Sequence, residues 1–137
     1  MNRVSRLREI RSEIESLKDE EKRLSKPVAV NMGMIGNLYS LFPMSLKRIR
    51  PDANPLDTNS RKMFLYAVLY IFSPLTLTGD VMRHKLRECV SVVIGCTPTG
   101  VSRDYKTAMF FYATYQEFRD CVDGVIADML EVLGKKE

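Results

Sequence analysis

Hydrophobic residues recur at alternating spacings of three and four along most of this chain, and that period is typical of helices with one apolar face. The pattern predicts helices over residues 3–25, 60–72 and 79–94, a short helix after residue 97 and a last helix from residue 105 toward the C-terminus. Four aromatic residues within 110–115 are too dense to assign to one face, so this stretch is either a helix buried on two sides or a short strand, and we favour the helix. The chain is therefore predicted to be all-α, with about five helices.

The first predicted helix, residues 3–25, is charged on all sides except for one narrow apolar stripe. The stripe consists of Leu7, Ile10, Ile14, Leu17 and Leu24. These residues occupy the a and d positions of three heptads, with Glu21 at the third a position. Glu13 and Lys18 flank the stripe, where they would pair between the chains of a parallel dimer. We therefore expect either an extended, coiled-coil-like helix that forms homo-oligomers or an amphipathic helix that lies on its own domain.

Pro27 ends this helix, because proline lacks the amide hydrogen and disfavours a helical conformation at the residue before it. Residues 27–59 are then interrupted by two glycines and by further prolines. They predict an irregular linker, with short helical turns at most around residues 35–42 and 45–49. The expected organisation is an N-terminal amphipathic helix (1–26), a linker or hinge (27–59) and a helical domain (60–137).

Capping residues set the expected borders within the helical domain. Asn59 or Ser60 can begin the helix over 60–72, and Thr78 can begin the next helix, which runs from 79 to 94. The last helix ends at Gly134 and carries a long apolar stripe. The stripe consists of Phe118, Val122, Val125, Ile126, Met129, Leu130 and Leu133. A long C-terminal helix with an acidic opposite face is therefore predicted, and it offers a second surface for self-association.

The stretch from Leu86 to Lys106 has the outline of a helix-turn-helix, within the longer segment 79–106. Gly95 can adopt the left-handed conformation that ends one helix, Thr97 can cap the next one, and Pro98 suits its first position. Apolar residues on both sides of the turn, which let the helices pack, are Val90, Ile94 and Val101. Alternatively, Gly95 simply joins two core helices, and the polar residues after it are solvated.

The net charge of +4 is distributed unevenly along the chain. Residues 1–26 carry 8 basic and 6 acidic side chains, residues 45–107 carry 10 and 5, and residues 108–137 carry 3 and 6. A positive excess of +5 thus lies on the segment that contains the turn, which favours a polyanionic partner. Hydrophobic residues, at 45%, are sufficient for a packed core.

A helix-turn-helix places the start of its second helix in the DNA major groove, which calls for small or hydrogen-bonding side chains there. Arg103 can contact guanine O6 and N7 or a phosphate, and Lys106, about one turn later, suits the DNA backbone. The predicted DNA-binding residues are Thr97, Thr99, Ser102, Arg103 and Lys106, with Arg83, Lys85, Arg87, Arg61 and Lys62 as further basic contacts. The expected partner is double-stranded DNA.

The letters GCTPTGVSRDYK resemble the turn and recognition helix of LacI-like bacterial and phage repressors. In that family a glycine is followed by a small apolar residue, by Ser or Thr, and then by Val-Ser-Arg on the second helix. The pattern is matched by Gly95, Cys96, Thr97, Val101, Ser102 and Arg103. Ser91 stands where the family usually has alanine, and Asp104 stands where a buried aliphatic residue is usual, so the second helix is expected to be rotated or packed differently. The resemblance covers about 20 of the 137 residues and implies major-groove binding by Thr99, Ser102 and Arg103.

The sequence lacks the signatures of catalysis and of membrane insertion. It has one histidine, no neighbouring Cys–His or Ser–His pair and no glycine-rich phosphate loop, so we predict that it is not an enzyme. Cys89, Cys96 and Cys121 are an odd number without zinc-ligand spacing, which predicts free thiols, no metal site and no cofactor. The N-terminus lacks a secretory signal, and the longest apolar run, 63–72, is about half of a membrane-spanning length. A cytoplasmic protein is expected.

Two functions from different classes are consistent with these features. The first is that of a small oligomeric DNA-binding protein, either a transcriptional regulator or a phage-type DNA-packaging adaptor. The second is that of a helical scaffold, in which the N-terminal heptads and the acidic C-terminal helix bind protein partners and no DNA is bound. The features that separate the two are the exposure and direction of Thr99, Ser102, Arg103 and Lys106.

Overall fold

The computed structural model describes residues 2–135, and within them the chain forms helices and no strand. The elements in chain order are α1 (Arg3–Ser25), η1 (Met32–Met34), α2 (Ile35–Ile49), α3 (Thr58–Phe72), η2 (Pro74–Thr78), α4 (Leu86–Ile94), α5 (Pro98–Thr114) and α6 (Gln116–Val132), where η marks a 3-10 helix. The prediction of an all-α protein is confirmed.

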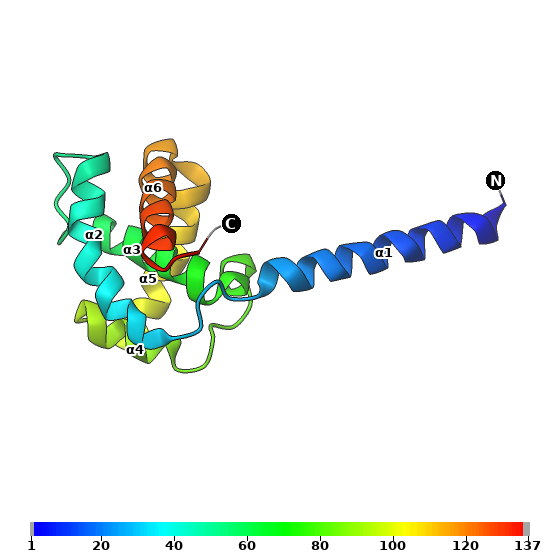
Figure 1. Ribbon diagram of the computed structural model, residues 1–137, viewed down its shortest axis with the longest axis horizontal. Coiled ribbons are helices and arrows are strands. Elements are labelled where there is room, and N and C mark those ends of the chain that lie inside the picture. The colour runs from blue at the N-terminus through cyan, green and yellow to red at the C-terminus, as the bar shows by residue number, and fades with distance from the viewer. Residues whose placement is uncertain (1, 136–137) are drawn as a thin grey trace.

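The helix α1 extends away from the rest of the molecule (Figure 1). Asn2 caps its start, because the side-chain oxygen of Asn2 accepts a hydrogen bond of 2.8 Å from the amide of Ser5. None of the residues of α1 is buried, and among the other elements the helix comes close to η2. Of the two predicted arrangements, the structure therefore has the extended helix and not one that lies along its own domain.

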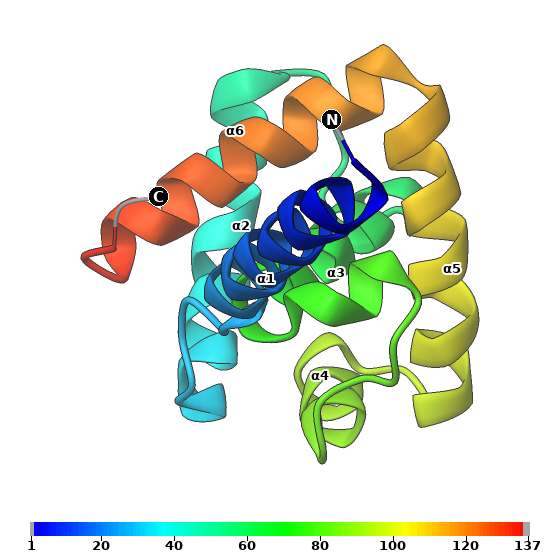
Figure 2. The ribbon, with the colours of Figure 1, turned by 90° about the vertical axis from the view of Figure 1, so that its right-hand side faces the viewer.

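The central helix of the remaining domain is α3 (Figure 2), because nearly every side of it is covered. Its buried residues are Ser60, Met63, Phe64, Leu65, Ala67, Val68, Leu69, Ile71 and Phe72. Both α5 and α6 pack against α3, and α2 packs against α6, so the core lies between these four helices. The backbone amides of Val28 and Ala29 both donate to the carbonyl of Ile71, which ties the chain after α1 to the end of α3.

Residues 35–49 form one continuous helix, α2, so the prediction of an irregular linker over 27–59 is wrong for this part. The core takes up four apolar residues of α2 at helical spacing, Ile35, Leu38, Phe42 and Leu46. Their burial contributes about 1.5–3 kcal/mol each, which outweighs a cost of about 3 kcal/mol for Pro43 inside the helix. The predicted exposed loop is limited to the segment between α2 and α3, and the helical domain begins well before residue 60.

The next helix, α3, begins at Thr58, slightly earlier than predicted. Its cap is Asp57 and not Asn59 or Ser60, because Oδ1 of Asp57 accepts a hydrogen bond of 2.7 Å from the amide of Ser60. Ser60 is itself buried and donates its hydroxyl to the carbonyl of Asn54 at 2.7 Å, which closes the loop before the helix.

The segment 79–85 is irregular, and the prediction of a helix over 79–94 is wrong for this first part. The Thr78 hydroxyl donates backward to the carbonyl of Leu75 at 2.8 Å and so closes η2 instead of capping a helix ahead of it. Gly79 has a left-handed φ of +107°, which ends η2. Lys85 also has a positive φ, +64°, and α4 starts immediately after it.

The helix after the turn, α5, runs through to Thr114, so the aromatic cluster is helical as favoured from the sequence. The chain then bends at Tyr115, which has an extended backbone, and the predicted last helix is divided between α5 and α6. Arg119 stabilises this break, because its guanidinium donates to the carbonyls of Tyr112 and Ala113 at 3.1 and 3.2 Å. These carbonyls lie at the end of α5, where a cation is favourable.

Candidate nucleic-acid interface

A tight turn joins α4 to α5. Gly95 ends α4 with a φ of +71°, and the amide of Cys96 donates to the carbonyl of Ser91 at 3.0 Å. Thr97 caps α5, because its hydroxyl oxygen accepts a hydrogen bond of 3.0 Å from the amide of Gly100. The turn therefore has the glycine, the cap and the N-terminal proline at the positions that the sequence predicts.

One face of α5 carries polar and basic side chains into solvent. Thr99, Arg103 and Lys106 are all exposed, and 75% of the Arg103 side chain is accessible. Their spacing of four and three residues places them in one row along the helix. The opposite face holds Val101 and Ala108, which are fully buried in the core. The start of α5 is thus fixed on one side and open on the other.

A cleft of about 320 Å³ lies beside this row, between α5, α4 and the irregular segment before α4. The residues that line it are Val81, Met82, Arg83, His84, Lys85, Arg87, Glu88, Ser102 and Tyr105. Arg87 connects its two walls, because Nη1 of Arg87 donates to the hydroxyl of Ser102 at 3.2 Å. We call the part of this cleft that is lined by Lys85, Arg87 and Ser102 the basic cleft. Glu88 is the carboxylate at this cleft, 3.6 Å from the Arg87 guanidinium.

Arg83 lines the same cleft but is committed to the fold. Its Nη2 donates to the carbonyl of Val30 at 2.6 Å, and its backbone amide donates to the hydroxyl of Ser73 at 3.1 Å. Its Nη1 is buried and has no hydrogen-bond partner among residues 2–135. Arg83 therefore holds the irregular segment against the chain that follows α1.

Arg61 and Lys62 lie against the buried side of α5 and not at the basic cleft. Nη2 of Arg61 is 3.3 Å from Oδ2 of Asp104, whose side chain is only 7% exposed. Nε of Arg103 approaches the other oxygen of Asp104 at 3.5 Å. The Lys62 ammonium sits 5.8 Å from the centre of the Phe111 ring. The structure thus brings Arg61 close to Arg103 through their shared partner Asp104, whereas Lys62 packs on Phe111, and neither Arg61 nor Lys62 lines the cleft.

The Arg61–Asp104 pair explains how a carboxylate is accommodated where the resembled repressors have an aliphatic residue. An unpaired buried carboxylate would be costly, and the guanidinium from α3 compensates its charge. The pair also joins α3 to the start of α5, so it orients the helix that bears the exposed row. Sequence reasoning missed this pairing because the two residues are 43 positions apart and no local pattern links them.

The residues of the cleft that sequence reasoning missed include His84 and Tyr105. Tyr105 follows Ser102 by three positions, so it shares a helix face with Ser102, and that spacing was the available signal. His84 lies in the irregular segment that was predicted to be helical, and its place at the cleft depends on that correction.

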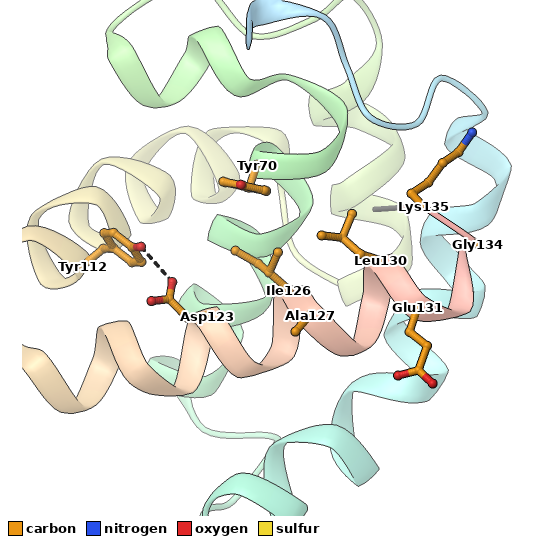
Figure 3. Close-up of a pocket in the computed structure, with 9 residues that line it drawn as sticks. All are labelled: Tyr70, Tyr112, Asp123, Ile126, Ala127, Leu130, Glu131, Gly134 and Lys135. Atoms are coloured by element: carbon orange, nitrogen blue, oxygen red, sulfur yellow. Dashed lines mark hydrogen bonds between the residues drawn. The ribbon is translucent and has the colours of Figure 1, made fainter. Parts of the chain in front are cut away.

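A larger cavity, of about 860 Å³, lies at another part of the molecule, between α3, α5 and α6 (Figure 3). The Tyr112 hydroxyl donates to Oδ1 of Asp123 at 2.7 Å, and its ring stacks on that of Tyr66 with centroids 4.3 Å apart. Glu131 lines the same cavity. The charged residues that line it are the carboxylates of Asp123 and Glu131 and the one ammonium of Lys135, so the lining carries a net negative charge that disfavours a polyanion.

The hydrogen-bonded Tyr112 is expected to make stability sensitive to alkaline pH. Burial of the ring, the hydrogen bond to Asp123 and the Asp123 charge raise the pKa of Tyr112 to about 12. In the unfolded chain the pKa is about 10. Below pH 10 the phenol is protonated in both states; between about pH 10 and 12 the unfolded chain loses the proton first, so the free energy of unfolding falls.

Urea unfolding at pH 9, 10 and 11 measures this effect. Wild type is expected to lose more unfolding free energy over this range than Tyr112→Phe, which lacks the ionisable group. Tyr115→Phe, which removes the hydroxyl of an exposed tyrosine, is the matched control. Its free energy of unfolding is expected to change with pH as that of wild type does. Equal pH dependence in Tyr112→Phe and wild type would contradict the expectation.

Comparison with known protein families, curated proteins and solved structures finds no match to this chain. Within residues 2–135, no helix is both long enough and apolar enough to cross a bilayer. In the same part of the chain, no three His, Cys, Asp or Glu side chains are grouped so that they could hold a metal ion. Cys89, Cys96 and Cys121 are free thiols, as predicted.

Proposed function

We propose that this protein binds double-stranded DNA, with α5 as the recognition helix. The observation that carries the proposal is the exposed row of Thr99, Arg103 and Lys106 at the start of a helix that a glycine turn holds against α4. A recognition helix reads base edges with its N-terminal residues, so it must begin at the surface and must not be covered by its own domain.

Each residue of the row suits one kind of DNA contact. Thr99 is small enough to let the helix start approach the base edges, and its hydroxyl can donate or accept. Arg103 has a planar guanidinium that can form two hydrogen bonds to O6 and N7 of one guanine. Lys106 lies about one turn further along the helix and suits a phosphate of the DNA backbone.

The basic cleft supplies the second part of the interface. Lys85 and Arg87 are exposed beside the start of α5 and can contact phosphates on one side of the groove. The amides in the first turn of α5 add a favourable partial positive charge for an anion. We assign Arg61, Lys62 and Arg83 to support of the domain, because each packs against or bonds to other parts of the chain.

We also propose that the protein self-associates through α1, whose apolar stripe is exposed. An oligomer with several recognition helices suits a transcriptional regulator or a DNA-packaging adaptor, and the same domain serves either role. A helical scaffold without DNA binding remains the competing function, and the exposed stripe of α1 favours it equally. The two differ in whether the duplex is bound at all.

A salt-titrated binding assay with a fluorescent duplex of random sequence tests the proposal. Affinity is expected to fall steeply with NaCl, because each neutralised phosphate releases condensed cations. Lys106→Ala is expected to make the plot of log affinity against log salt concentration less steep by about 1 unit, because one phosphate contact is lost. Lys47→Ala, which removes an exposed lysine on α2, is the matched control and keeps the wild-type slope. Absence of binding at low salt would overturn the proposal and favour the scaffold.

A further inference from the structure

The apolar stripe of α1 is uncovered in the structure. The side chains of Leu7, Ile14, Leu17 and Leu24 are 53%, 45%, 65% and 59% exposed. A helix of 23 residues that is otherwise charged gains little stability from its own backbone and needs its apolar face to be covered. The helix points away from its domain (Figure 1), so the cover must come from another molecule.

We infer that the cover is α1 of a second copy of this chain, running antiparallel, with Leu7 of each copy opposite Leu17 of the other. This inference rests on the proposed self-association through α1 and is independent of DNA binding. The sequence alone suggests a parallel pair on account of Glu13 and Lys18, but two further observations favour the antiparallel one, and a third selects its register.

The first observation is the segregation of charge along residues 3–21, the part of α1 that precedes its basic last turn with Lys22 and Arg23. Residues 3–11 carry four basic and one acidic side chain, and residues 12–21 carry one basic and five acidic side chains. The net charges of the two segments are therefore +3 and −4. An antiparallel pair places each basic segment beside the acidic segment of the other copy, whereas a parallel pair places like segments side by side.

The second observation concerns the two charged residues on the line of the stripe. Continued in both directions, the heptad pattern places Arg3 at a d position and Glu21 at an a position. With Leu7 opposite Leu17, Ile10 of one copy lies opposite Ile14 of the other. The same register puts Arg3 opposite Glu21 at both ends. In a parallel pair, Glu21 would face Glu21, and Arg3 would face Arg3.

The third observation selects the register. A shift by one heptad, with Leu7 opposite Leu24, would carry Arg3 of the second copy beyond Ser25, the last residue of α1, and would leave Arg3 with no facing residue on the helix. In the inferred register the helix of the second copy begins level with Glu21. At this level α1 and η2 enclose a pocket of about 370 Å³. Its lining includes Leu17, Glu21, Leu24, Pro74 and Leu75. The inferred register therefore places the start of the second helix at this pocket.

The resulting assembly is a rod with one domain at each end. Its two-fold axis passes beside Ser12, and the two Ser25 residues lie about 39 Å apart along the rod at 1.5 Å per helical residue. The two helical domains are thus separated by the α1 pair and not held side by side, as a parallel coiled coil would hold them.

Charge exchange at the stripe ends tests the arrangement, with sedimentation velocity of the full chain as the readout. Arg3→Glu and Glu21→Arg are each expected to weaken dimerisation about tenfold, because each creates two like-charge contacts. The double variant R3E/E21R restores both pairs and is expected to dimerise like wild type. Both single changes suit the helix dipole, so circular dichroism is expected to show no loss of helix. Equal dimer affinity in all four proteins would overturn the antiparallel register.

Disulfide trapping provides an independent readout of direction. Leu7→Cys and Leu17→Cys are oxidised separately and as an equimolar mixture, and peptide mapping identifies the linked positions. The antiparallel pair predicts a link between positions 7 and 17 in the mixture alone, with wild type as the control for native cysteines. A link between two copies of position 7 would overturn the inference. A chain that stays monomeric at all concentrations would overturn both self-association and this arrangement, and the separate binding assay would still test DNA binding.

Discussion

Replacement of Asp104 by alanine is expected to lower the free energy of unfolding by about 2 kcal/mol. The side chain of Asp104 is 7% exposed and neutralises Arg61, whose own side chain is 32% exposed. Removal of one partner of a fully buried pair costs about 3–5 kcal/mol. Because about a third of the Arg61 side chain is exposed, solvent partly screens the charge that is left without a partner. The expected cost is therefore about 2 kcal/mol, below the range for a fully buried pair.

The double variant Arg61→Met/Asp104→Leu separates the lost pair from lost volume. Both charges are replaced by apolar side chains of similar size, and stability is expected to return to within about 1 kcal/mol of wild type. Asp52→Ala removes a carboxylate that is 84% exposed, and this control is expected to change stability by less than about 0.5 kcal/mol. Urea unfolding at neutral pH measures all of them. An Asp104→Ala protein as stable as the control would show that the pair does not hold α5.

Replacement of Arg103 by alanine is expected to weaken binding to a preferred duplex by about 5- to 150-fold and to relax sequence preference. The range corresponds to about 1–3 kcal/mol for a two-bond contact from arginine to guanine. Because the Arg103 side chain is 75% exposed, its loss is expected to leave folding stability nearly unchanged. The preferred duplex is obtained by selection from random sequence with the wild-type protein.

Two variants test whether Arg103 reads bases or only supplies charge. Arg103→Lys keeps the charge without the planar fork and is expected to stay weak on the preferred duplex. Lys106→Ala is expected to weaken binding to all sequences to a similar extent. Anisotropy titrations with preferred and scrambled duplexes measure both effects. If Arg103→Ala lowers affinity equally for both duplexes, Arg103 contacts phosphate and does not read sequence.

The features that sequence reasoning predicted correctly are those with local causes. The turn before α5 depends on the left-handed freedom of Gly95, the capping hydroxyl of Thr97 and the fixed φ of Pro98, all within four residues. The extent of α1 likewise follows from a local period that ends before Pro27. Such signals act through neighbouring residues, so they can be read without knowledge of the fold.

The errors arose where tertiary packing overrode local signals. Pro43 and two glycines indicate a linker, yet burial of one apolar face keeps α2 continuous across the proline. The apolar spacing after Thr78 predicts a helix, yet the hydrogen bonds of Arg83 to Val30 and Ser73 hold this segment in an irregular path. In both places the deciding contacts come from residues distant in the sequence.

The sequence alone determined that the chain is helical, where the tight turn lies and which residue types follow it, because periodicity and capping are short-range properties. The tertiary structure alone decided which basic residues line one cleft and which pair with other parts of the chain. Lys85 and Arg87 lie at the cleft beside α5, whereas Arg61 forms an ion pair with the buried carboxylate of Asp104. A cation's role depends on its neighbours in space, and the packing of α3, α4 and α5 sets those neighbours.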